Sequence, residues 1–253
     1  MRLLFVANWK MNPDSVREAV MLWNATKKYA QKARKTSVVV CPPTPFIASC
    51  ATKSDGLVFF GAQDVSLFPN GAHTGEVSTG MLKDMHVRYI IAGHSERRAL
   101  GESNELIARK VQAVLASGLT PILCIGEHER GMHGEHFAFI EEQIRGSLHG
   151  ISKARAPKII LAYEPLWAIG RTSAQAMSPN DVHEMALFIR KILSKMYGRS
   201  VGMSIPILYG GSVEPSNINP IVREGAVQGV LVGHASLVAK NVADMLFALE
   251  KAH

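Results

Sequence analysis

The chain has 253 residues, of which 47% are hydrophobic and 19% are charged. This composition predicts a folded protein and excludes extensive disorder. The apolar run before Asn8 is too short for a signal peptide, and no run reaches the roughly 18 apolar residues of a membrane span. The three cysteines are widely spaced, which is typical of free thiols in a reducing compartment. We therefore expect a cytoplasmic protein without a membrane partner.

The formal net charge of +7 is compatible with an anionic partner. The densest basic cluster is KKYAQKARK at residues 27–35, which has no interleaved aromatic platform and no recognised nucleic-acid motif. We expect this cluster to be the solvated end of a helix, and we expect no nucleic-acid partner. A small phosphorylated ligand accounts for the charge equally well.

Eight apolar stretches recur along the chain, and most of them are continuous rather than alternating. Such stretches are typical of parallel strands that are covered on both faces. The predicted strands are 3–8, 37–42, 57–63, 88–93, 119–125, 158–164, 204–210 and 229–234. Helices are predicted between them at 14–32, 103–116, 135–148, 179–196, 215–224 and 241–249, with a short one starting at Pro45.

Strand and helix thus alternate throughout, and no composition shift or flexible linker divides the chain. This pattern predicts an α/β fold, a single (β/α)8 TIM barrel domain over residues 1–253. The rival is a doubly wound open sheet, which usually has a glycine-rich first turn. Here the first predicted strand ends in NWKMN, so the barrel is favoured.

Chemically active residue types follow several of the predicted strands. In a barrel of this kind, functional sites form at the C-terminal ends of the strands. Each residue type alone is more common on a surface or in a structural role, but together on one rim they predict a catalytic site. They are Asn8 and Lys10, then His94, Ser95 and Glu96, then Glu164, then Gly211 and Ser212, and finally Gly233 and His234.

Eight short motifs carry a resemblance to a known family. They are ANWKMN (7–12), GAQDVS (61–66), GAHTGEVS (71–78), AGHSERR (92–98), PILCIGE (121–127), YEPLWAIG (163–170), ILYGGSV (207–213) and LVGHASL (231–237). With these motifs in this order, the chain resembles the triosephosphate isomerase family over essentially its whole length. The resemblance implies a small phosphorylated triose substrate, interconversion of dihydroxyacetone phosphate and D-glyceraldehyde 3-phosphate, and neither cofactor nor metal. Two alternatives stay open, an isomerase of another short ketose phosphate and a non-catalytic phosphosugar-binding protein.

Glu164 is the predicted catalytic base. Moving a hydrogen between adjacent carbons needs one base that removes a proton and returns it to the next carbon. A carboxylate is a weak base in water and becomes a stronger one when water is excluded. The apolar loop after Glu164, with Trp167 and Ile169, is therefore expected to close over it.

The resemblance implies that His94 is a neutral electrophile and proton shuttle, which is the established arrangement in that family. Lys10 is expected to supply positive charge against the developing oxyanion and the phosphate. Asn8 would position Lys10 and the substrate. Ser95 and Glu96 are expected to support these groups from a second layer.

Backbone N–H groups of Gly211, Ser212, Gly233 and His234 are expected to bind the phosphate, because barrels commonly hold phosphate after strands seven and eight. By resemblance, Gly170 adds another N–H group from the closed loop. Two positions depart from the family pattern. The strand-eight turn usually reads Gly-Gly, and His234 would be strained if its φ had to be positive. After Gly170, residues 171–176 are longer than the usual Thr-Gly-Lys.

The segment around Thr74 resembles a loop that projects into a neighbouring subunit. The resemblance therefore implies a homodimer in which Thr74 supports Asn8 and Lys10 of the partner subunit, and a tetramer stays open. Two further features are assigned no function. His128, His133 and His136 are expected in an exposed loop rather than a metal site, and Cys124 is expected to pack rather than to act as a nucleophile.

Overall fold

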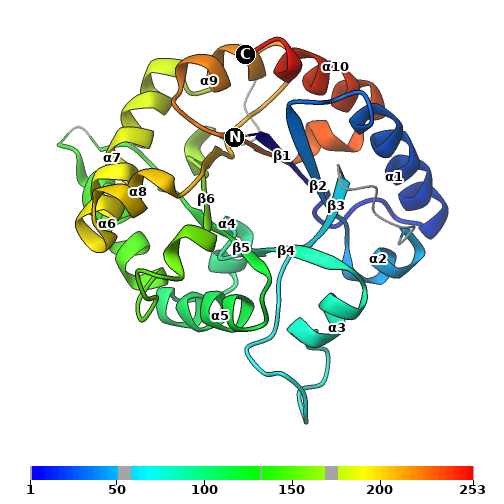
Figure 1. Ribbon diagram of the computed structural model, residues 1–253, viewed down its shortest axis with the longest axis horizontal. Coiled ribbons are helices and arrows are strands. Elements are labelled where there is room, and N and C mark those ends of the chain that lie inside the picture. The colour runs from blue at the N-terminus through cyan, green and yellow to red at the C-terminus, as the bar shows by residue number, and fades with distance from the viewer. Residues whose placement is uncertain (1, 51–57, 132, 169–175, 253) are drawn as a thin grey trace.

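The computed structural model describes residues 2–50, 58–131, 133–168 and 176–252. Its strands are β1 (Leu3–Asn8), β2 (Thr36–Cys41), β3 (Val58–Ala62), β4 (Val87–Ala92), β5 (Thr120–Ile125), β6 (Ile160–Tyr163), β7 (Ile207–Tyr209) and β8 (Gly229–Val232). All pair in parallel with their sequence neighbours, and β8 also pairs with β1, so the sheet is a closed barrel. Helices form a ring outside the strands (Figure 1). The predicted (β/α)8 TIM barrel is confirmed.

The helices of the outer ring follow the strands in turn. They are α1 (Val16–Ala30), α2 (Thr44–Cys50), α3 (Thr79–Asp84), α4 (Ser95–Ala99), α5 (Asn104–Ala116), α6 (Glu135–Ser147), α7 (Pro179–Tyr197), α8 (Arg199–Ser204), α9 (Ile218–Glu224) and α10 (Ala239–Glu250). Short 3-10 turns, η1 (Ala156–Lys158), η2 (Leu166–Ala168) and η4 (His234–Leu237), lie beside β6 and after β8.

The strands are buried on both faces, which explains their continuous apolar sequences. Inside the barrel, residues such as Val6, Ile91 and Leu208 form a compact cluster. On the outer side, strand residues such as Phe5 and Leu161 belong to a larger core shared with the helices. Since burial of apolar area stabilises the fold by about 25 cal/mol per Å², both layers favour the same strand register.

Several helix and strand boundaries differ from those predicted. The helix predicted from residue 14 begins at Val16, because the Ser15 hydroxyl caps it by accepting from the Glu18 N–H group. The helix predicted over 215–224 begins only at Ile218. The strand predicted over 204–210 is confined to Ile207–Tyr209, because Ser204 ends a helix and Pro206 has no N–H group to donate.

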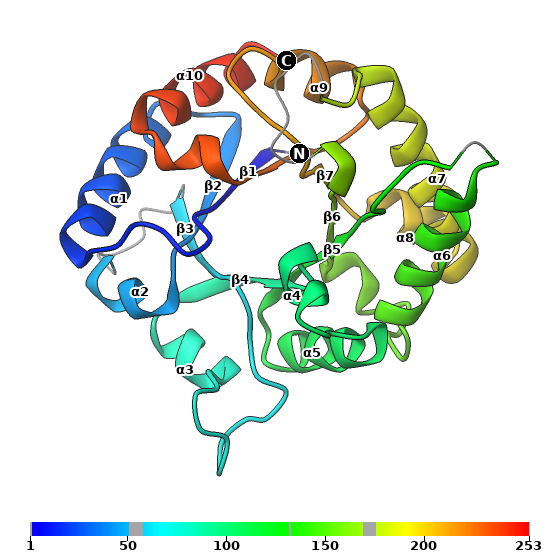
Figure 2. The same cartoon turned by 180° about the vertical axis from the view of Figure 1, so that it is seen from behind.

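The connection between β3 and α3 projects from the side of the barrel in both views (Figure 1 and Figure 2). It contains the GAHTGEVS motif, and its exposed residues include Phe68 and Thr74. The ring of Phe68 stacks on the ring of His73 with centroids 3.7 Å apart. No helix in the described part of the chain is long and apolar enough to cross a membrane.

Candidate active site

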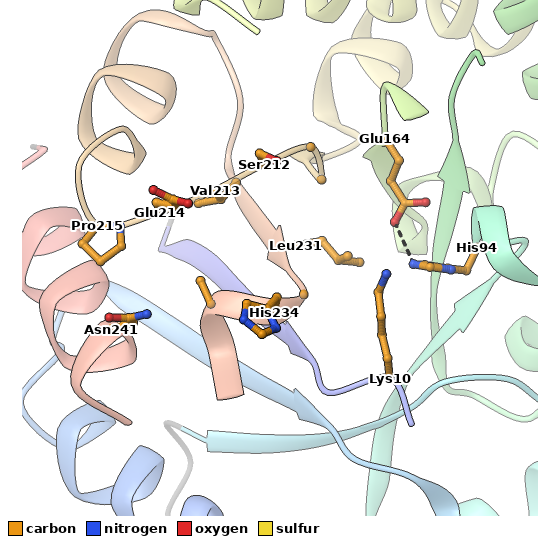
Figure 3. A pocket seen from close by; sticks show the side chains of 14 residues that line it. Lys10, His94, Glu164, Ser212, Val213, Glu214, Pro215, Leu231, His234 and Asn241 are labelled. Carbon is orange, nitrogen blue, oxygen red and sulfur yellow. Dashed lines mark ion pairs between the residues drawn. The ribbon is translucent and has the colours of Figure 1, made fainter. Parts of the chain in front are cut away.

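A cavity of about 660 Å³ opens at the C-terminal ends of the strands (Figure 3). Charged and imidazole side chains line it from the segments that follow β1, β4, β6, β7 and β8. These are Lys10, His94, Glu164, Glu214 and His234. The structure therefore brings together four residues that the sequence predicted for one rim, Lys10, His94, Glu164 and His234, although they lie far apart in the chain. Glu214 was not predicted.

Glu164 follows β6 directly and is 1% exposed. Its backbone N–H donates to the carbonyl oxygen of Ile125 at 2.7 Å, which extends the sheet pairing by one residue. The Oε2 atom accepts from the backbone N–H of Ser95 at 3.4 Å. Oε1 has no hydrogen-bond partner among the described residues. A buried carboxylate with a free oxygen beside a cavity is chemically poised to take a proton.

Room for this carboxylate depends on a glycine in β7's C-terminal turn. A Cβ atom placed on Gly210 would lie 2.8 Å from Cγ of Glu164, closer than real Cβ contacts allow. The backbone N–H of Gly210 donates to the Tyr163 carbonyl at 2.7 Å, which holds the turn against β6. Gly210 is therefore needed for close approach rather than for a special φ.

His94 lies at the N-terminus of α4 and is buried. Its Nδ1 atom accepts from the backbone N–H of Glu96 at 3.2 Å. A nitrogen that accepts a hydrogen bond carries no proton, so this contact assigns the neutral ring with its proton on Nε2. Nε2 lies 3.5 Å from Oε1 of Glu164 and faces the cavity (Figure 3).

Lys10 adopts a left-handed backbone with φ of 53°, which is uncommon for a residue other than glycine. Two contacts hold it there. The Lys10 N–H donates to Oδ1 of Asn8 at 3.0 Å, and the Gln63 amide donates to the Lys10 carbonyl at 2.8 Å. The ammonium donates to Oε1 of Glu96 at 2.6 Å. These contacts fix both ends of the lysine at the cavity.

The charge of Lys10 also acts on its partner. Burial alone would raise the pKa of the Glu96 carboxyl, but the hydrogen bond and positive charge of Lys10 outweigh it and lower that pKa below its ordinary value. Glu96 therefore remains a carboxylate at neutral pH. Asn8, Ser95 and Glu96 each contact a residue that lines the cavity.

The turns after β7 and β8 form the other wall of the cavity. Gly211 and Ser212 follow β7, and Gly233 and His234 follow β8. The Ser212 hydroxyl donates to the Ala168 carbonyl at 2.8 Å, which ties the β7 turn to the segment after Glu164. A Cβ atom on Gly233 would lie 3.4 Å from Cε of Lys10, so the lysine stem passes close to the β8 turn.

Comparison with known proteins identifies the family of this chain. The model of the family described as "Triosephosphate isomerase" matches residues 3–249. The chain belongs to the triosephosphate isomerase family. It is 39% identical to the triosephosphate isomerase of Rhodopirellula baltica, with 99% of each chain covered. The triosephosphate isomerases of Carboxydothermus hydrogenoformans and Thermus thermophilus are each 40% identical, with at least 95% of either chain covered.

Two departures from the triosephosphate isomerase pattern were noted in the sequence. His234 is not strained, because the positive-φ residues other than glycine in the described ranges are Lys10, His86 and Ala226. The longer loop after Gly170 lies outside the described residues, apart from Ala176, and so does Gly170 itself.

Sequence reasoning assigned no role to two residues that organise the triosephosphate isomerase site. Gln63 holds the Lys10 carbonyl, and the buried Oε1 of Glu127 accepts from the Tyr163 hydroxyl at 2.8 Å and from Nε1 of Trp167 at 2.9 Å. Gln63 belongs to the motif GAQDVS and Glu127 to the motif PILCIGE, and a polar residue at or just after the end of a predicted apolar strand was the available signal.

Cys124, in β5, lies close to Glu164, but its thiol is unsuited to nucleophilic attack. Burial, followed by the charge of neighbouring Glu164, raises the pKa of the Cys124 thiol well above its ordinary value. The thiol therefore stays protonated, in agreement with the packing role predicted. The histidine-rich segment 128–136 forms no metal-ligand cluster within the residues described.

Proposed function

We propose that this chain catalyses the interconversion of dihydroxyacetone phosphate and D-glyceraldehyde 3-phosphate, with Glu164 as the base. The observation that carries the proposal is the free, buried Oε1 of Glu164 on the wall of the cavity, 3.5 Å from Nε2 of His94. The carboxylate removes a proton from the carbon next to the carbonyl and returns it to the carbonyl carbon. The product then leaves with its phosphate unchanged.

Neutral His94 acts on the oxygens while Glu164 acts on the carbons. Its Nε2–H donates to the substrate carbonyl oxygen, stabilises the enediolate and moves a proton between the two oxygens. The hydrogen bond from Glu96 N–H to Nδ1 supports this role, because it keeps the proton on the nitrogen that faces the cavity. An imidazolium would instead lose this contact, so the helix terminus disfavours it.

Lys10 supplies the positive charge of the site. Its ammonium stabilises the enediolate oxygen and the phosphate dianion, and Asn8 and Glu96 hold it in place. The phosphate binds to backbone N–H groups of Gly211, Ser212, Gly233 and His234, with Gly170 adding one from the loop that follows Glu164. Remote phosphate contacts of this kind position the reacting carbons.

We also propose that the active form is a homodimer. Met11 is 90% exposed and Leu100 is 77% exposed, and Phe68 and Met81 are exposed as well. These apolar side chains come from the segments after β1, β3 and β4, and a dimer interface formed by these segments would bury them. Thr74, at the projecting loop, would then brace Asn8 and Lys10 of the partner subunit.

We further propose that residues 1–253 form one domain and that the protein is cytoplasmic. The closed barrel runs from β1 to β8 without an interruption in strand order. All three cysteines, Cys41, Cys50 and Cys124, are free and buried, which fits a reducing compartment.

The test is a coupled assay of the purified protein on D-glyceraldehyde 3-phosphate, with a four-carbon ketose phosphate assayed in parallel. We expect turnover of the triose phosphate at least a hundredfold above that of the larger sugar, because productive geometry is sensitive to about 1 Å of misplacement. Preference for the four-carbon sugar would instead support another ketose phosphate isomerase, and activity on neither would support a binding protein.

A further inference from the structure

His234 places an imidazole in the wall of the active-site cavity. It is the first residue of η4, directly after Gly233, and it lines the cavity together with Lys10 and Asn241, between which its ring appears in the view of Figure 3. Ser212, from the β7 turn, lies on the opposite side of the cavity in this view. The ring therefore lines the same cavity as the backbone groups that the proposed function assigns to the phosphate.

The backbone of this turn accommodates the histidine without strain. The Ser236 N–H donates to the Gly233 carbonyl at 2.9 Å, and the Ser236 hydroxyl donates to the same oxygen at 2.6 Å. These bonds close the η4 turn, and the φ of His234 is not positive. The turn thus keeps its N–H groups and carries a side chain in addition.

Neither ring nitrogen of His234 has a hydrogen-bond or ion-pair partner within the part of the chain that the structure describes. The other titratable groups lining the cavity are Lys10, His94, Glu164 and Glu214. Lys10 is engaged by Glu96, and His94 by the Glu96 backbone. His234 is therefore an imidazole with both nitrogens available at the wall of an anion site.

We propose that the His234 imidazole binds the substrate phosphate directly, as a side-chain donor added to the backbone N–H groups of the β7 and β8 turns. The inference rests on the proposed function, because it takes the anion to be the phosphate of a triose. A second glycine at this position, the usual family residue, would offer the N–H group alone. This chain thus has a phosphate subsite of different composition.

An imidazole differs from a backbone N–H group because it can gain a proton and with it a positive charge. A histidine side chain ordinarily changes charge between about pH 5 and pH 8. A hydrogen bond between two charged groups is roughly twice as strong as a neutral one. Affinity for a dianion should therefore rise as the pH falls through this range, by an amount that disappears when the imidazole is removed.

Sulfate is the probe for this effect, because a phosphate monoester changes its own charge near pH 6 whereas sulfate stays a dianion. The dissociation constant of sulfate is measured by titration calorimetry between about pH 5.5 and pH 8. The proteins compared are the wild type, His234→Gln, His234→Ala and the control His149→Gln. His149 is exposed and follows α6, which leads to the opposite end of the barrel from the cavity.

We expect the wild-type dissociation constant to fall by about three- to tenfold more than that of His234→Gln over this range, since exposure weakens the charged contact. His149→Gln should follow the wild type. At the high-pH end, His234→Ala should bind sulfate more weakly than His234→Gln, because glutamine offers a neutral side-chain donor and alanine offers none. Contributions from Lys10, His94, Glu164 and Glu214 are common to all four proteins and cancel in the ratios.

Equal pH dependence in the wild type and His234→Gln would overturn the inference, as would an equal loss of that dependence in His149→Gln. Circular dichroism on each sample establishes that the variants are folded. Isomerase activity is measured on the wild type separately. An active wild type without the pH difference refutes the role of His234 alone, whereas an inactive wild type refutes the proposed function without affecting the sulfate measurement.

Discussion

Replacing Glu164 by aspartate keeps the carboxylate and removes one methylene group. In the structure, Oε1 of Glu164 lies 3.5 Å from Nε2 of His94, and Oε2 lies 3.4 Å from the Ser95 N–H group. The shorter side chain withdraws both oxygens by about 1 Å, and misplacement of that size can cost about a hundredfold in rate. A hundredfold loss corresponds to about 2.7 kcal/mol of transition-state stabilisation.

The assay is steady-state turnover of D-glyceraldehyde 3-phosphate by wild type and Glu164→Asp. We expect kcat to fall about a hundredfold and KM to change much less, because the phosphate contacts that we propose come from the β7 and β8 turns. Glu184→Asp is the matched control, since Glu184 is an exposed glutamate on α7. A kcat of Glu164→Asp close to that of the wild type would refute the assignment of the base.

Three further variants are expected to give four outcomes. Trimming the β3–α3 loop at Thr74 should give monomers with weak activity, measured by sedimentation and assay of one sample; a fully active monomer would contradict the bracing role. Glu96→Gln removes the negative charge that holds the Lys10 ammonium and should lower kcat about tenfold. Because Lys10 lowers the pKa of Glu96, that carboxylate stabilises the folded state above its ordinary pKa of about 4.3 and less as the pH falls through the lowered value. The stability difference between wild type and Glu96→Gln should therefore shrink in acid, as measured by urea unfolding, and a difference that grows in acid would be inconsistent with the ion pair. Lys110→Met removes the 2.7 Å partner of the buried Glu102 carboxylate but leaves Arg97 at 2.9 Å, so it should lower the free energy of unfolding by about 1.5–3 kcal/mol, whereas a loss under about 0.5 kcal/mol would argue against that pairing.

The strands were predictable because burial on both faces leaves a continuous apolar sequence. Seven of the strand ranges predicted were matched within a few residues, while the range 57–63 includes Leu57, which lies outside the described residues. The short helices α3 and α8 were missed. Each has six residues, too few to display the helical period on which the other predictions depended.

The charged residues of the site were predictable because a parallel barrel brings the C-terminal ends of its strands together. The contacts of Gln63 and Glu127 were not, since they depend on three-dimensional approach rather than on strand position. The left-handed backbone of Lys10 has no signature in the sequence, because lysine gives no preference for it. Gln63 reaches Lys10 across 53 positions, and only the folded barrel reveals that pairing.

The central claim is that one carboxylate, Glu164, moves a proton between adjacent carbons of a triose phosphate. The most direct measurement is conversion of dihydroxyacetone phosphate in D₂O, followed by NMR, for the wild type and Glu164→Gln. We expect the wild type to place deuterium on the carbon next to the aldehyde of the product, because the carboxylate exchanges its proton with solvent before returning it. Glu164→Gln should form almost no product. Undiminished conversion by Glu164→Gln, with deuterium still incorporated at that carbon, would contradict the account.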